Sequence, residues 1–393
     1  MHICGIIAEY DPFHTGHAQQ ISMIRQNLGS ECAVVCVMSG NWTQRCAPAI
    51  VPKHLRARLA LLGGADLVLE LPLPYAISSA QWFARGGVSV LAGTGVVTHL
   101  CFGSECGELT ALEQTAHCLD RAEYSQTLRT FLDQGLSFPT ARQRAARQLI
   151  GPAADCLSLP NNNLGVEYLR ALAWCGSGIV PLTIPRQGAG HGEGPRDGFA
   201  SASYLRQCLR EGRREEAGTY LLPCEGKLLD STSFSDISRA ERAILYRLRQ
   251  MTAQELAALP DCGEGLPSRI VRAVRQGTSL EEVLSLAKTK RYPLARLRRL
   301  LLWAYLGLTQ ADRPEAPPYL RVLGMNETGR ALLREIGLRG VLPLLTKPAH
   351  VRRLPAPAQR LFDLEAHATD LYGLCLPQVP PCGTEWLQGP VIL

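Results

Sequence analysis

The chain carries, directly after its first four residues, the stretch Gly5-Ile-Ile-Ala-Glu-Tyr-Asp-Pro-Phe-His14-Thr-Gly16-His17. Apolar residues around its start predict a buried strand, namely Ile3, Ile6 and Ile7. Asp11-Pro12 predicts the end of that strand, because proline cannot continue a hydrogen-bonded ladder. Residues 18–28 then favour a helix. A strand that runs through a tight turn into a helix is typical of the phosphate-binding corner of a doubly wound α/β fold.

Two imidazoles at the mouth of the predicted helix indicate chemistry on phosphates. His14 and His17 are three residues apart, so both can reach the same ligand. Gly16 between them lets a flat ligand lie against bare backbone. A lone histidine is more often an ordinary surface or core residue, but this pair directly follows an amino-terminal strand. We therefore interpret His14 and His17 as the catalytic pair of an adenylyl-transferring site.

The composition is that of an ordinary globular protein, and it narrows the class of site. The 393 residues, 46% hydrophobic and 19% charged, suffice for two or three domains. No apolar run is long enough to cross a bilayer, and no export signal is evident. The 14 cysteines include no Cys-x-x-Cys pair, which argues against a zinc site or a disulfide framework and favours a reducing cytoplasm. No metal is expected beyond Mg²⁺ carried by a nucleotide.

Strand and helix signals alternate through the first half of the chain. Strands are predicted over 33–38, 66–71 and 96–102, and helices over 53–62, 79–91 and 109–132. Such alternation predicts a parallel sheet covered by helices on both faces. Ligands of these sheets collect at the carboxyl ends of the strands. The segments that follow such ends should therefore meet in one cleft, and they are 14–17, 39–45 and 103–105.

Two arginines further along are expected to bind phosphate. A short strand predicted over 180–184 leads to Arg186, and Arg206 lies one turn into a helix that begins at Ser201-Ala-Ser203. A guanidinium can donate two parallel hydrogen bonds to phosphate oxygens. The ordinary alternatives are a surface ion pair for Arg186 and simple helix capping for the two serines.

Backbone and loop segments complete the expected cleft. The backbone around Gly103 can accept the adenine and ribose edges, although a plain turn glycine is the alternative. Asn161-Asn162-Asn163 predicts a loop that leads into a helix, with an asparagine as the helix cap. The glycine-rich segment 187–194 is expected to act as a lid. Ser39, Asn41 and Gln44 follow a predicted strand, and we expect them to line the pocket of the second substrate.

The character of the chain changes at about residue 222, where helices rich in Leu and Arg begin. They are predicted over 239–251, 267–275, 280–287 and 293–308, and a mixed segment runs from 319 to 393. We therefore divide the chain into domains 1–221 and 222–393. Six cations fall within twelve residues, namely Lys288, Lys290, Arg291, Arg296, Arg298 and Arg299. Such a cluster can neutralise the phosphates of a nucleic acid. The alternative is a helix face that is exposed to solvent.

Several blocks, in order along the chain, resemble the bacterial tRNA(Met) cytidine acetate ligases. The first is Ala8-Glu-Tyr-Asp-Pro-Phe-His-Thr-Gly-His17, followed by Met38-Ser-Gly-Asn-Trp-Thr-Gln-Arg45. The others are Gly64–Pro72, Phe102-Gly-Ser-Glu105, Pro160-Asn-Asn162, Ser201-Ala-Ser203, Gly265–Arg269, Lys288-Thr-Lys-Arg-Tyr292 and Arg321–Asn326. Together they span roughly the first 330 residues, and their shared order is more specific than any single motif.

The resemblance implies a Rossmann-like nucleotidyltransferase domain with an HxGH motif, followed by a mainly helical tRNA-binding region. It implies that acetate attacks the α-phosphate of ATP, and that the acetyl group then passes to N4 of the wobble cytidine of elongator tRNA(Met). Neither DNA nor a membrane is an expected partner. The expected ATP contacts are Ile7, Ala8, Glu9, Tyr10, Asp11, Pro12, Phe13, His14, Thr15, Gly16, His17, Ala18, Gln19, Gln20, Gly103, Asn161, Asn162, Arg186, Ser201 and Arg206.

Some residues differ from the ligase pattern and define the alternatives. Asp11 stands where the ligases usually have Asn, and Asp-Pro-Phe-His-x-Gly-His is closer to the cofactor-making adenylyltransferases. The second hypothesis is therefore an adenylyltransferase acting on a small phosphate-bearing substrate. This hypothesis gives the basic carboxyl-terminal half no function. The third is a non-catalytic RNA-binding protein, against which the intact His14-Thr-Gly-His17 argues.

Overall fold

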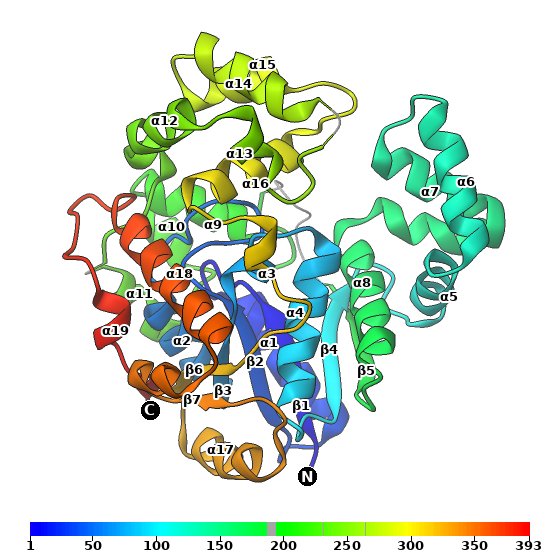
Figure 1. Ribbon diagram of the computed structural model, residues 1–393. Helices are drawn as coiled ribbons and strands as arrows, with labels where there is room; N and C mark the ends of the chain where they lie inside the picture. Colours follow the sequence, from blue (N-terminus) through cyan, green and yellow to red (C-terminus); the bar gives the residue numbers. More distant parts are fainter. Residues whose placement is uncertain (187–193, 231, 264) are drawn as a thin grey trace.

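In the described part of the chain, a sheet of eight strands forms the centre of the molecule (Figure 1). The computed structural model describes residues 1–186, 194–230, 232–263 and 265–393. The strands lie in the order β5-β4-β1-β2-β3-β6-β7, and β8 pairs with β6. Their bounds are β1 Ile3–Ala8, β2 Ala33–Ser39, β3 Leu67–Leu71, β4 His99–Ser104, β5 Val180–Pro185, β6 Leu320–Met325, β7 Leu344–Leu345 and β8 Val391–Ile392.

The five strands from the first half of the chain are parallel to one another. β2 is buried along its whole length, as expected of a central strand with helices on both sides. The strands predicted over 33–38, 66–71, 96–102 and 180–184 are confirmed, with ends that differ by a few residues. The predicted α/β class with a mostly parallel sheet is therefore confirmed.

One strand of the sheet comes from the carboxyl-terminal part of the chain. β6 runs antiparallel to β3, with Leu67 opposite Met325 and Val68 opposite Gly324. The segment from 319 onward was expected only to be mixed, so this pairing is an addition to the sequence-based prediction. The division into domains 1–221 and 222–393 stays a prediction, and the sheet draws strands from both parts.

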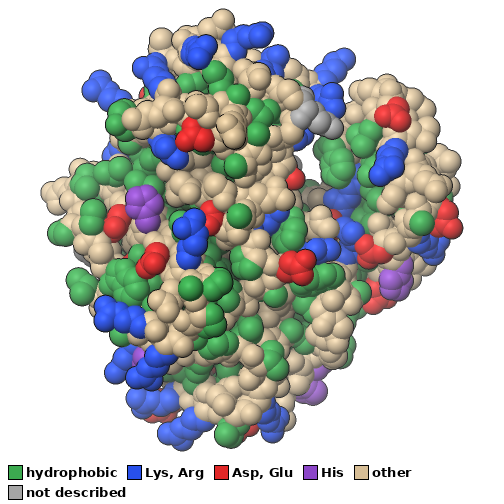
Figure 2. All heavy atoms as spheres, viewed as in Figure 1, with side chains coloured by type: hydrophobic (Ala, Val, Ile, Leu, Met, Phe, Trp, Pro, Cys, Tyr) green, Lys and Arg blue, Asp and Glu red, His purple; other side chains and the backbone are tan. Residues whose placement is uncertain are grey.

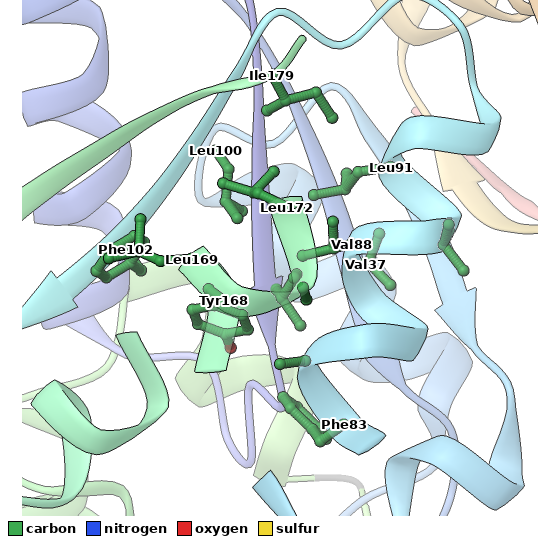
Figure 3. Packing of buried hydrophobic residues seen from close by; sticks show 14 of the residues in the cluster. Val37, Phe83, Val88, Leu91, Leu100, Phe102, Tyr168, Leu169, Leu172 and Ile179 are labelled. Atoms are coloured by element: carbon green, nitrogen blue, oxygen red, sulfur yellow. The ribbon is translucent and has the colours of Figure 1, made fainter. Parts of the chain in front are cut away.

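Helices cover both faces of the sheet because side chains alternate along each strand. On one face Val37 and Leu100 pack against α4 (Ala80–Gly93) and α8 (Pro160–Cys175), as Figure 3 shows. Ile7 belongs to the same apolar cluster. On the other face the next residues along, such as Ile6 and Cys36, pack against three helices. These helices are α1 Thr15–Leu28, α2 Lys53–Leu62 and α9 Ala202–Arg210, and α10 Arg214–Gly218 and α11 Pro223–Asp230 follow them.

A helical lobe projects from one side of the sheet between β4 and α8 (Figure 1). It contains α5 (Thr110–Leu119), α6 (Ala122–Asp133), α7 (Phe138–Ile150) and the 3-10 helix η1 (Gly151–Ser158). The helix predicted over 109–132 is confirmed as two helices, with a break at Asp120-Arg121. The space-filling view shows the surface hollowed between this lobe and the rest of the molecule (Figure 2).

A second group of helices lies beyond the carboxyl ends of the parallel strands (Figure 1). It has its own apolar core, to which Trp303 and Leu300 contribute, and it confirms the helices predicted between 239 and 308. We call it the helical body, and it consists of α12 Glu241–Gln250, α13 Ala253–Ala257, α14 Leu266–Gln276, α15 Leu280–Ala287 and α16 Leu294–Tyr305.

The chain then returns to the sheet and closes around its edge. The remaining helices are α3 Leu73–Ala76, α17 Glu327–Arg339, α18 Ala356–Gly373 and α19 Thr384–Leu387, with 3-10 helices η2 Ile237–Ala240, η3 Gln310–Asp312 and η4 Pro348–Arg353. α18 packs on both the sheet region and the helical body, through Phe362 in one cluster and Ala368 in another. Among the described residues, no helix is long and apolar enough to cross a membrane.

Candidate active site

His14 and His17 form a stacked pair at the start of α1. Their ring centroids lie 3.8 Å apart, and their planes differ by 29°. His14 Nδ1 accepts the backbone N–H of Gly16 over 3.1 Å, and His17 Nδ1 accepts the backbone N–H of His14 over 3.2 Å. Each ring therefore satisfies one N–H group of the helix start, in the reciprocal arrangement of a capping box.

The hydrogen bonds and the burial of both rings determine their protonation. Because each Nδ1 accepts a hydrogen bond, the single proton of the neutral ring resides on Nε2. Burial, together with the charges of Arg186 and Arg206, lowers the pKa of His14 to about 3. Burial, followed by the neighbouring His14 and Arg186, lowers the pKa of His17 well below its usual value. The pair therefore offers two neutral N–H donors at neutral pH.

Much of the surrounding stretch is packed as scaffold. The Tyr10 and Phe13 rings are buried and lie edge to face, 4.9 Å apart, and the His17 ring contacts both. A Cβ on Gly63 would lie 2.2 Å from the Phe13 ring, so the end of α2 accepts this ring only with glycine there. The other predicted ATP contacts of this stretch lie in β1, in the turn or on α1: Ile7, Ala8, Glu9, Pro12, Thr15, Ala18, Gln19 and Gln20.

Asp11 ties the histidine motif to two distant segments. Its Oδ1 accepts the backbone N–H of Ile50 over 2.5 Å, and its carbonyl oxygen accepts the Arg206 guanidinium over 2.6 Å. Arg206 Nη1 also lies 3.5 Å from Asp11 Oδ2. Ser201 caps the helix that carries this arginine by accepting the Tyr204 N–H over 3.3 Å. The structure thus brings Arg206 beside His14, and its binding of phosphate stays a prediction.

A network centred on Glu105 joins the end of β4 to the start of α8. Glu105 Oε1 accepts from the Asn161 backbone and side-chain amide groups, over 3.1 and 2.6 Å, and its Oε2 accepts the Asn162 N–H over 2.7 Å. Asn162 Oδ1 accepts in return the N–H of Glu105 over 2.8 Å. Arg186 donates to Asn161 Oδ1 over 2.7 Å, and a Cβ on Gly103 would lie 3.0 Å from Arg186 Cγ. Gly103, Asn161 and Arg186 therefore lie together.

The segment predicted to hold the second substrate is a loop that joins β2 to α2. Ser39 is fully buried, and its hydroxyl has no hydrogen-bond partner in the described part of the chain. Asn41 is engaged instead, since its Oδ1 accepts the Lys53 N–H over 2.8 Å and its amide donates to Thr369 Oγ1 over 3.2 Å. The backbone N–H of Gln44 donates to Glu9 Oε1 over 2.6 Å, which places Gln44 beside the motif.

Helix α18 holds this loop from the opposite side. Trp42 is fully buried between the rings of Tyr305 and Tyr372, and its indole donates to the Ala368 carbonyl over 2.9 Å. The Tyr372 hydroxyl donates to the carbonyl of Ala49 over 2.9 Å. The loop 39–50 is therefore fixed between the histidine motif and the carboxyl-terminal helix.

A buried cluster of charges fastens the carboxyl-terminal segment to the same loop. The Lys53 ammonium lies 2.6 Å from both Glu70 Oε1 and Glu385 Oε1, and Arg321 lies 2.5 Å from Glu385. Thr369 donates to the other oxygen of Glu385 over 2.8 Å. Because these charges are almost fully buried, each needs its partners, and α2, β3, β6 and α19 are held as a unit.

The predicted tRNA-binding cations lie on the helical body. Lys288, Lys290 and Arg291 form an exposed turn between α15 and α16. On α16, Arg296 donates to the Asp261 carbonyl over 2.9 Å, and Arg298 is exposed. Charges of Arg299 and Arg298 oppose the rise in pKa that burial gives the Cys46 thiol, so this end of the cluster lies near the loop 39–50. The cations do not join His14 and His17.

Sequence reasoning missed Arg56 and Glu105 as organisers of the site. Arg56 is fully buried and donates to the carbonyl oxygens of Glu9, Gly40 and Val51, so it joins the ends of β1 and β2. An arginine inside a predicted helix gave no signal of this role. For Glu105 the available signal was its place in Phe102-Gly-Ser-Glu105, one of the blocks that resemble the ligases. The predicted lid at 187–194 lies, except for Gly194, outside the described residues.

The described side chains offer no ready donor set for a metal ion. Among those residues there is no group of three or more His, Cys, Asp and Glu side chains that could hold a metal ion. The carboxylates next to the histidine motif are already engaged, Glu9 with the Gln44 N–H and Asp11 with the Ile50 N–H. A protein-held metal centre therefore has no obvious donor set in this part of the molecule.

Comparison with known proteins gives matches over the whole chain. Residues 1–383 match the model of the HIGH Nucleotidyl Transferase family. The chain is 36% identical to the tRNA(Met) cytidine acetate ligase of Syntrophomonas wolfei, covering 100% of this chain and 99% of that protein. It is 33% identical to the protein of the same name from Clostridium perfringens, with 100% of both covered.

Solved structures agree with these relatives. Thermotoga maritima TmcAL bound with alpha-thio ATP superposes with a TM-score of 0.93 at 31% identity, and 100% of both chains is covered. The apo form of the same protein superposes with a TM-score of 0.94 at 32% identity, again over 100% of both chains.

Proposed function

Because this chain belongs to the tRNA(Met) cytidine acetate ligase family, we propose that it uses ATP to join acetate to the wobble cytidine of elongator tRNA(Met). An acetate oxygen attacks the α-phosphate of ATP, and pyrophosphate leaves. The cytidine N4 amine then attacks the acetyl carbon of the mixed anhydride, AMP leaves, and N4 loses a proton. The product is N4-acetylcytidine.

The stacked His14–His17 pair carries this proposal. Attack on the α-phosphate builds negative charge on its oxygens, and preorganised donors in a buried site stabilise that charge. Two neutral Nε2–H groups at a helix start meet this need without the cost of burying two imidazolium cations. We assign His14 and His17 to that role.

The arginines and the Gly103 region are assigned to the rest of the nucleotide. Arg186 and Arg206, whose charges act on His14, would bind phosphate oxygens. The Glu105 network positions Arg186 and the start of α8 beside Gly103, where the absence of a side chain leaves backbone for the adenosine. We propose that Mg²⁺ enters with the triphosphate, as the engaged carboxylates suggest, and that it neutralises phosphate charge.

The loop 39–50 is assigned to acetate. The buried Ser39 hydroxyl, which lacks a partner among the described residues, is suited to bind a small carboxylate. Gln44 lies beside Glu9 at the same edge of the sheet. Asn41, predicted as a pocket residue, supports the loop through Lys53 and Thr369.

The helical body is assigned to the tRNA. Cytosine N4 is a weak nucleophile, so the anticodon base must be unstacked and held against the adenylate. The cations from Lys288 to Arg299 would then hold the anticodon backbone, with their α16 end near the loop 39–50. We place the reaction in the cytoplasm, in keeping with thiols that are free at every described cysteine.

One experiment separates the competing functions. The protein is incubated with ATP, labelled acetate and total tRNA, and the RNA is digested to nucleosides. Labelled N4-acetylcytidine that requires ATP and disappears in the His14→Asn variant supports the ligase. Pyrophosphate release without labelled RNA would instead support a small-molecule adenylyltransferase. ATP binding without turnover would leave a non-catalytic RNA-binding protein.

A further inference from the structure

Arginine and tryptophan side chains alternate across the outer surface of α4. The Arg313 guanidinium lies 4.0 Å from the centroid of the Trp82 ring, and the Arg85 guanidinium lies 5.2 Å from the same ring. Arg85 also lies 4.8 Å from the Trp174 ring on α8. The order is therefore Arg313, Trp82, Arg85 and Trp174, and we call these four residues the Arg–Trp ladder.

The two arginines of the ladder keep hydrogen-bond donors for a ligand. In the regions that the structure describes, neither Arg85 nor Arg313 forms an ion pair, and the Arg313 guanidinium donates a hydrogen bond to Ser78 Oγ over 3.1 Å. Asp261 is the carboxylate whose charge acts on Arg313. Stacking on indoles uses the faces of a guanidinium and leaves the in-plane N–H groups for an anion. A phosphate group is one anion that such in-plane donors bind.

The first arginine of the ladder is continuous with the basic cluster of α16. Arg313 shares a small hollow with Arg296, Arg299 and Trp303, at the junction of the helical body and α4. The segment that carries Arg313 runs along α4, and the Tyr75 hydroxyl donates to the Pro314 carbonyl over 2.6 Å (Figure 1). Cations therefore extend from α16 onto the sheet domain.

The last residue of the ladder has an open aromatic surface. Trp174 is 42% exposed, although large apolar side chains are usually covered. It lines an open hollow of about 940 Å³ together with Gly93, Val97 and Leu342. An indole at the rim of such a hollow can stack with a nucleobase, since every base has an apolar face.

We propose that the Arg–Trp ladder is a second RNA-binding surface, which holds backbone phosphates at Arg313 and Arg85 and stacks an unpaired base on Trp174. This inference rests on the proposed tRNA substrate. RNA is favoured over an acidic protein because cations alternate with aromatic rings along the ladder, the combination that binds sugar-phosphate backbone and bases together. The ladder would add contacts that the α16 cluster alone does not supply.

The test compares the Arg85→Gln/Arg313→Gln variant with a control of equal charge change, Arg330→Gln/Arg334→Gln, on the exposed side of α17. The dissociation constant for tRNA(Met) is measured at several salt concentrations. We expect the ladder variant to lower the slope of log K against log salt by about 1 per lost phosphate contact. The α17 control should keep the slope of the unmodified protein.

Two further variants distinguish a direct contact of the ladder with RNA from a purely structural role of its residues. Trp174→Ala, at an exposed position, is expected to weaken tRNA binding about tenfold. Arg85→Lys/Arg313→Lys keeps the charge but loses the planar stack, so it should recover only part of the affinity. If the first ladder variant fails to fold, Trp174→Ala decides the question alone.

Acetate-dependent pyrophosphate exchange without tRNA is measured in parallel. Exchange in the unmodified protein, together with salt slopes and affinities of the ladder variants equal to those of the control, would overturn the ladder while leaving the proposed function intact. Absence of exchange in the unmodified protein would instead count against the proposed function. The two failures are therefore separate.

Discussion

The Trp42 indole donates its N–H to the carbonyl oxygen of Ala368 over 2.9 Å, across 326 residues of sequence. This bond belongs to a set in which α18 also bonds Asn41 and Ala49. The carboxyl-terminal segment therefore builds one wall of the loop that we assign to acetate. No specific role could be predicted for residues 319–393 from their pattern, and this contact supplies one.

Thr369→Val is expected to impair acetate binding. The hydroxyl of Thr369 accepts from Asn41 and donates to Glu385, and valine has the same shape without either bond. Loss of about 1.4 kcal/mol from such bonds would raise KM for acetate about tenfold, with KM for ATP unchanged. Steady-state exchange kinetics measure both constants. Thr369→Ser, which keeps the hydroxyl, should restore the acetate KM, and equal rises in both constants would contradict the assignment.

His14→Asn is expected to abolish most of the chemistry without unfolding the protein. Asparagine can cap α1 in place of the imidazole, but it has no donor at the position of Nε2. Removing one such donor typically slows reaction by about 10²–10³-fold. Acetate-dependent pyrophosphate exchange reports the rate, and thermal unfolding reports the fold. Exchange within twofold of the unmodified protein would remove His14 from the mechanism.

Glu105→Gln is expected to weaken ATP binding. The carboxylate accepts three N–H groups at the start of α8, and the amide of glutamine would present a donor to one of them. A lost charge-assisted bond of about 1.5 kcal/mol predicts a rise of about tenfold in KM for ATP. The exposed neighbour provides the matched control, Glu108→Gln. Equal KM values in the two variants would show that the network is dispensable.

Acid is expected to destabilise the fold through the buried histidines. Burial lowers the pKa of His14 and of His54 to about 3, whereas both titrate near 6.5 in the unfolded chain. The unfolded state therefore binds protons first as pH falls below 6.5. Stability is then lost at up to about 1.4 kcal/mol per pH unit for each such histidine, down to the native pKa.

Urea unfolding at pH 7, 6 and 5 measures this loss. His14→Asn removes one of the titrating groups, so its free energy of unfolding should fall less steeply below pH 6.5. A slope identical to that of the unmodified protein would show that the native pKa of His14 is not depressed. Because His14 and His17 stay neutral in the folded protein down to well below pH 6, their titration should not change the exchange rate between pH 6 and 8.

The parallel sheet and the corner that carries His14 and His17 could be predicted because their signals are local. A Val-rich run such as 33–38 and a Pro-Phe-His turn specify strand and turn within a few residues. β6 could not be predicted in this way. Its residue Arg321 is charged yet buried against Glu385, and only a distant partner makes that placement favourable.

The site shows the same limit at the level of single side chains. Asn162 stays a predicted ATP contact, but the sequence gives no sign that its side chain accepts the backbone N–H groups of Glu105 and Cys106 from the end of another strand. The buried Arg56 guanidinium donates hydrogen bonds to three carbonyl groups, which the chain brings together only on folding. Periodicity and motifs report residue type and spacing, and they do not report such long-range pairings.

In the proposed reaction, acetate itself attacks the α-phosphate of ATP. Acetate labelled with ¹⁸O at both oxygens tests it most directly, because the attacking oxygen becomes the bridge of the anhydride and stays with AMP when the amine takes the acetyl group. Mass spectrometry of the products should find AMP with one ¹⁸O, and N4-acetylcytidine with the other. AMP without ¹⁸O would contradict the account, as would ADP in its place.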